Sequence, residues 1–141
     1  MTRVDVTGTA VPRFNRREVG AFARTVLLAL EKMDRLEREI EDVSIAFVDD
    51  DAMRELNKRF RKKDKTTDVL TFRGDDSFLG DVVICIDQAR RQAADEKHSL
   101  ATEVRYLILH GVLHALGYDH ETDDGEMNAL EVKVREAVRL A

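Results

Sequence analysis

Hydrophobic and polar positions along the chain repeat with two periods, which predict strands and helices in alternation. In residues 3–9 (RVDVTGT), apolar and polar side chains alternate, as they do in a strand with one buried face. Residues 42–50 (DVSIAFVDD) alternate with apolar residues on both faces, which predicts a strand in the centre of a sheet. Two shorter apolar runs, 68–72 (DVLTF) and 81–87 (DVVICID), flank a loop rich in Gly and Asp and predict two more strands.

Apolar residues at helical spacing follow the first two strands. Asn15 is placed to cap a helix, with Glu18 three residues later and apolar residues recurring as far as Leu30. Asp50 and Asp51 suit the N-terminal end of a second helix because they complement its dipole. The predicted buried stripe of that second helix consists of Met53, Leu56 and Phe60.

Three more helices are predicted in the second half of the chain. A polar helix should cover 87–97, and an apolar one should cover 100–116 and end at Gly117. The last amphipathic helix is defined by Met127, Leu130, Val134 and Ala137. We therefore predict an α+β fold, a small mixed sheet of about four strands packed with about five helices, in a single domain over 1–141.

Composition narrows the class of protein. The 141 residues are 43% hydrophobic and 36% charged, as expected for a globular protein. No apolar run reaches the length of a membrane span, and the N-terminus lacks the apolar core of a signal peptide, so we expect a cytoplasmic protein without membrane contact. The net charge of -5 argues against a general nucleic-acid coat protein. Cys85, the one cysteine, is predicted to be a buried small hydrophobe.

Three of the four histidines lie in the stretch HGVLHALGYDH. His110 and His114 are four residues apart, so they share one helix face and can reach one metal ion. Gly117 can end the helix in a left-handed conformation, which would let His120 return as a third ligand. Three neutral imidazoles leave one position open, as catalytic zinc sites do. We predict one zinc ion per chain; copper and nickel also suit such ligands better than magnesium or calcium does.

Three residues in or before this stretch bear on the predicted metal site and its chemistry. His98 lies in a polar segment and is predicted to be solvated or to cap a helix. Asp119 could orient an imidazole or serve as a turn residue, and the sequence leaves both readings open. Gly111 stands where metzincin proteases, with the pattern H-E-x-x-H-x-x-G-x-x-H, carry their catalytic glutamate. A small zinc metallopeptidase is therefore an alternative that Gly111 disfavours.

Basic residues are concentrated in the segment 58–65, KRFRKKDK, of an otherwise acidic chain. Such a run can be a solvated helix end that complements the helix dipole. It can equally be a phosphate-binding edge, where an arginine beside a metal ion clamps a phosphodiester and stabilises developing negative charge. The sequence leaves these two readings open.

Together, the segments LNKRFRKKDKTTDVLTF, GDVVICID and HGVLHALGYDH resemble the YbeY family, bacterial single-strand-specific metallo-endoribonucleases of 16S rRNA 3′-end maturation and ribosome quality control. The resemblance runs from about Asp42 to the end of the chain. It implies a zincin-like helix, zinc ligation by His110, His114 and His120, and a catalytic role for Arg61. It also implies single-stranded RNA, ribosomal RNA and small ribosomal subunit components as partners.

Two positions depart from the family pattern. The family often has glycine after the functional arginine and proline before the T-D/N-V-L block, where this chain has Lys62 and Thr66. The departures concern the local loop shape. A third hypothesis remains beside the ribonuclease and the peptidase: a non-catalytic ribosome-assembly factor whose metal only joins the histidine helix to the turn after it.

Overall fold

The computed structural model describes residues 2–8, 16–119 and 121–140, which form four strands and five helices. The strands are β1 (Arg3–Thr7), β2 (Asp42–Val48), β3 (Val69–Arg73) and β4 (Phe78–Cys85). The helices are α1 (Arg16–Lys32), α2 (Asp50–Arg61), α3 (Ile86–Glu96), α4 (Leu100–Ala115) and α5 (Glu126–Ala137). The predicted α+β fold is confirmed. The proposed cap at Asn15 lies outside the described residues.

The strands form one mixed sheet in the order β1-β2-β4-β3. Strand β2 pairs in parallel with both β1 and β4, whereas β3 pairs antiparallel with β4 and lies at the edge. The central position predicted for β2 is therefore correct, and its Val43, Ile45 and Phe47 are buried on one face. One side of the edge strand β3 has no strand partner within the described sheet, and the candidate active site described below lies along this edge.

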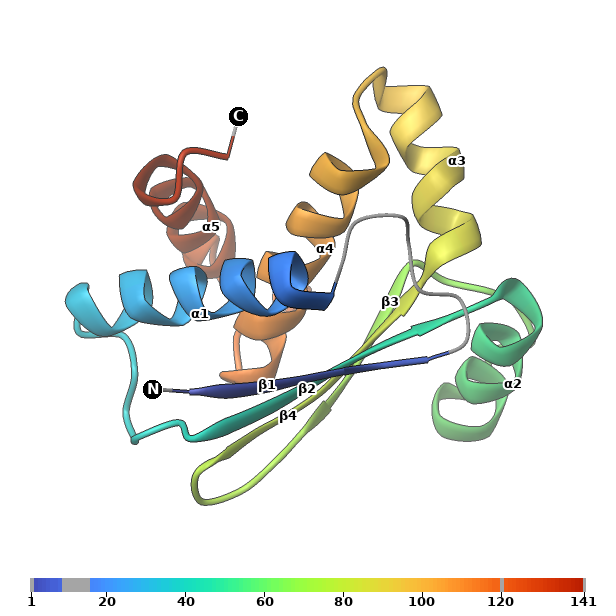
Figure 1. Ribbon diagram of the computed structural model, residues 1–141. Helices are drawn as coiled ribbons and strands as arrows, with labels where there is room; N and C mark the ends of the chain where they lie inside the picture. Colours follow the sequence, from blue (N-terminus) through green and yellow to red (C-terminus); the bar gives the residue numbers. More distant parts are fainter. Residues whose placement is uncertain (1, 9–15, 120, 141) are drawn as a thin grey trace.

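Helices cover both faces of the sheet unequally. The larger core lies between the sheet and helices α1, α4 and α5, which stand above the strands in Figure 1. The smaller core lies on the opposite face, where Met53 of α2 packs with Leu70, Val83 and Cys85. Cys85 has no exposed surface, and burial raises the pKa of its thiol, as expected of the buried small hydrophobe that the sequence predicts.

The predicted burial of Phe60 is wrong. Met53 is fully buried and Leu56 partly so, but Phe60 at the end of α2 is 56% exposed. The reason is tertiary: the small core beneath α2 ends at the edge strand β3, where Phe60 meets the ring of Phe72 edge to face but is not enclosed. Ala137 at the end of α5 is likewise exposed. Amphipathic spacing identifies a helix face but not how far along the helix its neighbour extends.

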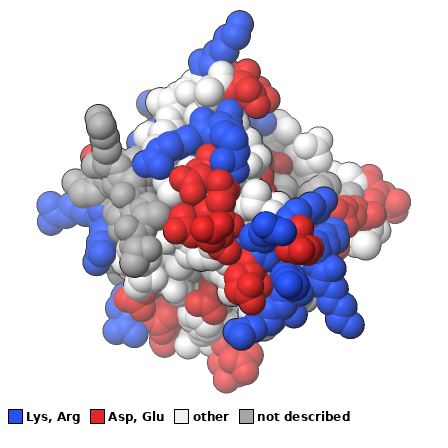
Figure 2. All heavy atoms as spheres, turned by 90° about the vertical axis from the view of Figure 1, so that its right-hand side faces the viewer, with Lys and Arg blue, Asp and Glu red and all other residues white. Residues whose placement is uncertain are grey.

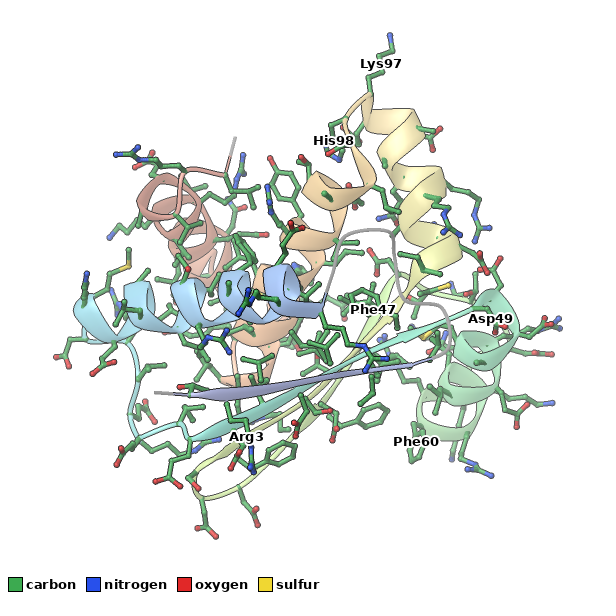
Figure 3. The ribbon with its side chains drawn as sticks, viewed as in Figure 1. Arg3, Phe47, Asp49, Phe60, Lys97 and His98 are labelled. Carbon is green, nitrogen blue, oxygen red and sulfur yellow. The ribbon has the colours of Figure 1, made fainter. Side chains whose placement is uncertain are left out.

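His98 is also placed differently from its prediction. Its Nε2 lies 2.7 Å from Oε1 of Glu103, a residue only 7% exposed, and its ring stacks on Tyr106. Gln92 donates to the other oxygen of Glu103 at 2.8 Å. The Gln92 contact joins α3 to α4, and His98 lies in the turn between them, at the upper corner of the molecule where Figure 3 labels it. His98 is therefore a turn residue that contacts α4 and stays partly exposed, with 27% of its side chain accessible.

An ion pair joins α2 to α3 beyond the carboxyl ends of β2 and β4. Asp50 accepts hydrogen bonds from both terminal nitrogens of Arg91, at 2.7 and 2.9 Å, and from the thiol of Cys85 at 3.3 Å. The hydrogen bonds from Arg91 outweigh partial burial and lower the pKa of Asp50 to about 2.

Replacing this carboxylate should reduce the pH dependence of stability in acid. The folded-state pKa of Asp50 lies below the unfolded value of about 3.9, so its contribution is present above pH 4 and is lost as the pH falls towards 2. Both side chains are more than a third exposed, so screening by water keeps the contribution small. We expect urea unfolding to separate Asp50→Asn from wild type at pH 7, and the gap to narrow as the pH falls from 4 through about 2. A gap of the same size at pH 7 and pH 2 would contradict this prediction.

Of the helices in the described residues, none combines the length and the hydropathy needed to span a membrane.

Candidate active site

Two histidines one turn apart on α4 form the centre of the candidate site. The Nε2 atoms of His110 and His114 lie 3.1 Å apart, and their ring centroids are separated by 4.6 Å. Both residues are partly exposed, although the neighbouring positions 111, 112, 113 and 115 are buried. The predicted sharing of one helix face is confirmed. Such an approach suits two ligands of one metal ion, and it is also the length of an N–H···N hydrogen bond between neutral imidazoles.

A carboxylate from α5 approaches this pair. Oε1 of Glu131 lies 3.9 Å from Nδ1 of His110, the ring nitrogen that faces away from His114. Metal-binding histidines commonly have a carboxylate near their second nitrogen, which helps to fix the ring and its tautomer. From the sequence, Asp119 was a candidate for this role, and Glu131 carried no local signal for it. In the structure Asp119 accepts from the backbone N–H of Glu121 at 3.0 Å, which favours the turn reading.

Gly111 faces the sheet and not the cleft. A Cβ atom at this position would lie 2.5 Å from Cγ1 of Val82, a fully buried residue of β4. The carbonyl of Gly111 also accepts a hydrogen bond of 3.4 Å from Thr71 on β3. The close approach of α4 to the sheet therefore explains the glycine, and leaves no room there for the glutamate of a metzincin protease.

We expect Gly111→Ala to destabilise the protein despite the higher helix propensity of alanine. The propensity gain is at most about 1 kcal/mol, whereas forcing a methyl group into a packed core costs about 1–3 kcal/mol. Denaturant unfolding should therefore show a net loss of stability. In a Val82→Ala background, which removes the clashing atom, the cost of Gly111→Ala should shrink or reverse. An equal cost in both backgrounds would contradict the packing explanation.

The third predicted ligand, His120, lies outside the described residues. Over the ranges 2–8, 16–119 and 121–140, no group of three or more His, Cys, Asp or Glu side chains is arranged to hold a metal ion. The turn that leads to His120 is described: Gly117 has φ +103°, the left-handed conformation that the sequence analysis expected of it. The zinc site with three histidines thus stays a prediction.

A cleft of about 460 Å³ opens beside the two histidines at the edge of the sheet. It is bordered by the end of α2, by β3 and the segment before it, by α4 and by the turn after α4. Its lining residues are Arg61, Thr67, Asp68, Val69, Leu70, Thr71, Arg73, His110, His114, Gly117, Tyr118, Asp119 and Glu121. The structure therefore brings Arg61 and the histidine pair to one cleft, although about fifty residues separate them in the sequence.

Arg61 owes its position to the way α2 ends. It is the last residue of the helix, and Lys62 follows with φ +57°, its N–H directed to the carbonyls of Asn57 and Lys58. The side chain of Asn57 is 1% exposed and donates to the carbonyl of Lys65 at 2.8 Å, which holds the chain against α2 after it reverses. Asn57 was not singled out from the sequence, because its burial inside a polar helix depends on this loop.

Arg73 adds a second guanidinium that the sequence analysis missed. It ends β3, lines the cleft, and its Nη2 would be 3.3 Å from a Cβ atom at Gly117. The guanidinium therefore lies against the turn that leads to His120. Its only sequence signal was its place directly after a predicted strand, and pairing of β3 at the sheet edge is what directs it to the cleft.

The surface around the end of α2 is strongly basic. Figure 2 shows Lys and Arg gathered at the lower right of this face, next to a group of Asp and Glu near its centre. All six basic residues of 58–65 are exposed, and the single acid there, Asp64, is paired with Arg54 at 2.7 Å. A local positive surface beside the cleft thus coexists with a net charge of -5 for the whole chain.

A larger hollow of about 1030 Å³ lies elsewhere, between α1 and the segment 36–41. The described residues that line it are mostly Leu, Ile, Glu and Arg, with no histidine among them. The smaller cleft is the better candidate for chemistry because imidazoles, guanidiniums and carboxylates converge on it.

Comparison with known proteins identifies the family of the chain. The sequence profile of a family described as Endoribonuclease YbeY matches residues 8–139. The chain belongs to the YbeY family. Members described as Endoribonuclease YbeY include one from Nautilia profundicola, 47% identical over 103 residues, which are 71% of this chain and 74% of that protein. One from Aquifex aeolicus is 51% identical over 100 residues, covering 67% of this chain and 64% of the relative.

Longer matches extend the similarity over most of the chain. The YbeY endoribonuclease of Campylobacter jejuni (strain RM1221) is 43% identical over 124 residues, which are 82% of this chain and 92% of that protein. The solution structure of TM1509 from Thermotoga maritima is similar with a TM-score of 0.66 and 26% identity, covering 96% of this chain and 89% of that one.

The backbone conformation of Lys62 bears on one of the two departures from the family pattern. The structure places this residue in the left-handed region, φ +57°, where glycine is free of strain and other L-residues are disfavoured by about 1–2 kcal/mol. The glycine that the family resemblance leads one to expect here would suit this conformation. Lys62 adopts it and still closes the helix with its N–H directed to the carbonyls of Asn57 and Lys58.

Proposed function

We propose that this protein is a zinc-dependent, single-strand-specific endoribonuclease that acts in 16S rRNA 3′-end maturation and ribosome quality control. Its site of action would be the cytoplasm, with ribosomal RNA and small ribosomal subunit components as partners. The observation that carries the proposal is that Arg61 and the pair His110 and His114 line one cleft in a member of the YbeY endoribonuclease family.

The proposed metal ligands are His110, His114 and His120, with one zinc ion per chain. Two ligand nitrogens bound to a tetrahedral zinc ion at about 2.0–2.1 Å stand roughly 3.3 Å apart, close to the 3.1 Å between the Nε2 atoms here. The two described histidines therefore fit the ion without rearrangement of the helix. Zinc held in this way would act as a Lewis acid and activate water near neutral pH.

The basic side chains have a distinct proposed role. Arg61 would hold two oxygens of the scissile phosphodiester with its planar guanidinium and stabilise the negative charge that grows on them during cleavage. Arg73 lines the same cleft and would bind a neighbouring phosphate. Glu131 would keep the imidazole of His110 in place through Nδ1.

The peptidase alternative is disfavoured by Gly111. A metzincin-type mechanism needs a carboxylate at this helix position, and Cβ there would lie 2.5 Å from Val82. The assembly-factor alternative requires the metal to be structural. Chelation should then lower the melting temperature strongly, whereas a domain whose helix is already packed on the sheet should tolerate it.

The decisive experiment combines metal analysis of the purified protein with an RNA cleavage assay. We expect about one zinc ion per chain, cleavage of a single-stranded RNA that stops on chelation and resumes with added zinc, and little cleavage of the corresponding duplex. Casein and unstructured peptides serve as control substrates and should remain intact. Zinc-loaded protein that leaves single-stranded RNA intact would overturn the proposal, and chelator-sensitive proteolysis would favour the peptidase.

A further inference from the structure

An exposed aromatic ring lies in the middle of the basic segment. Among the described residues the large hydrophobic side chains that are exposed are Leu28, Phe60 and Val132, at 51%, 56% and 42%. Leu28 is on α1 and Val132 on α5, whereas Phe60 lies between Arg59 and Arg61 at the end of α2. Figure 3 labels Phe60 at the opposite end of this helix from Asp49.

The ring of Phe60 is oriented by a contact with the edge strand. Its centroid lies 5.0 Å from that of Phe72 on β3, with the two planes inclined at 73°, an edge-to-face arrangement. This contact orients the ring while more than half of the residue stays accessible to solvent. When a planar ligand stacks on an exposed ring that is already held in place, little side-chain conformational entropy is lost on binding.

Phe60 adjoins the candidate cleft through the next residue in the chain, Arg61, which lines it. Its partner Phe72 packs on the α2 face of the sheet, whereas the neighbours of Phe72 on β3, Thr71 and Arg73, point to the other face and line the cleft. The ring therefore lies just across the edge strand from the cleft. A strand of RNA with a phosphate at Arg61 that continues over the edge of β3 would meet the ring of Phe60. A base beside the cleavage position could then stack on it.

The charges around Phe60 favour a polyanion as the ligand. Six Lys and Arg residues lie within 58–65, all exposed, and Asp64 is engaged by Arg54. Aromatic rings set among basic side chains are the usual platform for single-stranded nucleic acids, because the backbone meets the cations and a base stacks on the ring. A base within a duplex is already stacked on both faces and unavailable for such a contact.

We propose that Phe60 is a substrate-binding residue on which one unpaired nucleobase stacks, and that this contact contributes to the preference for single-stranded RNA. The proposal rests on the endoribonuclease function proposed above. The alternative reading, that Phe60 only shields Phe72 from water, predicts a loss of stability and no change in RNA binding when the aromatic face is removed.

Steady-state cleavage of a single-stranded RNA by Phe60→Leu tests the proposal. Leucine keeps the apolar cover over Phe72 but has no π-face, so we expect KM to rise about tenfold with kcat nearly unchanged. Phe60→Trp should restore the low KM, since indole offers a larger stacking face. Leu28→Ala, which alters an equally exposed residue on α1, is the matched control and should leave KM at the wild-type value.

A second measurement uses the wild-type protein, and is therefore independent of how the variants fold. A set of RNA oligonucleotides, each with one abasic nucleotide, should include one position whose loss of base raises KM about as much as Phe60→Leu does. For that oligonucleotide the Phe60→Leu variant should show no further loss, because both changes remove the same contact.

The outcomes separate the two proposals. If the wild-type protein cleaves single-stranded RNA but Phe60→Leu has the wild-type KM and no abasic position matters, the stacking proposal is wrong and the endoribonuclease function stands. If the wild-type protein neither binds nor cleaves RNA, both proposals fail. An effect of Phe60→Leu on binding of a protein, with RNA kinetics unchanged, would likewise overturn the assignment to a nucleobase.

Discussion

We expect His114→Ala to lose its bound zinc and, with it, cleavage of RNA. His114 is one of only three proposed ligands, and its Nε2 lies 3.1 Å from that of His110. Removing an outer-shell partner of a metal ligand typically weakens metal affinity by about 10–100-fold, so loss of a direct ligand should exceed that. Elemental analysis of the dialysed variant, alongside wild type, measures the effect.

The fourth histidine supplies the control. His98→Ala removes an imidazole that contacts Glu103 and Tyr106, not the cleft, so its metal content should equal that of wild type even if its stability is lower. If His114→Ala retains close to one zinc ion per chain, the ligand assignment is wrong and the two imidazoles are joined only by a hydrogen bond. That result would also remove the main support for metal-dependent catalysis.

Arg61→Ala should slow cleavage of single-stranded RNA about a hundredfold. Loss of one charge-assisted contact to a developing oxyanion typically costs about 3 kcal/mol, which corresponds to that factor in rate. The fold and the metal should remain, since Arg61 is exposed and is not a proposed ligand. Arg61→Lys should recover only part of the rate, because an ammonium restores the charge without the planar fork of donors. Single-turnover rates and metal content together measure these effects.

A neighbouring lysine variant distinguishes a catalytic role of Arg61 from simple neutralisation of RNA phosphates. Lys63→Ala removes an exposed cation two residues from Arg61, and should weaken RNA binding and lower its salt dependence with little change in the single-turnover rate. If Arg61→Ala behaves in the same way, or cleaves RNA at the wild-type rate, the segment 58–65 is a solvated helix end or a general phosphate-binding surface without a catalytic arginine.

Most of the secondary structure could be predicted from local patterns. Alternation over 42–50 identified β2 as a central strand, and the glycine after the histidine helix has the left-handed φ that was expected of it. Errors lay at boundaries: β4 begins at Phe78, earlier than its apolar run suggested, because Gly80 lies within the strand and pairs with Arg73. Strand pairing with β3 tolerates a residue that strand propensity disfavours.

Part of the candidate site could also be predicted from local patterns, and part could not. The spacing of His110 and His114 was sufficient to place both on one face of α4, because a helix repeats every 3.6 residues wherever it lies. Local patterns could not bring Glu131 or Arg73 to the site, because they reach it from α5 and from the end of β3 through tertiary packing. The assignment of His120 as the third ligand stays a prediction.

The sequence by itself determined what depends on neighbours a few residues away: the order of strands and helices, the histidine pair, the glycine that ends α4, and the basic segment at the end of α2. Only the tertiary structure decided that Arg61 lines the same cleft as the two histidines, that Val82 leaves no room for a side chain at Gly111, and that Phe60 is exposed. These facts depend on which face of the sheet each helix covers and on where the edge strand ends. Packing between distant segments sets both, and periodicity carries no information about it.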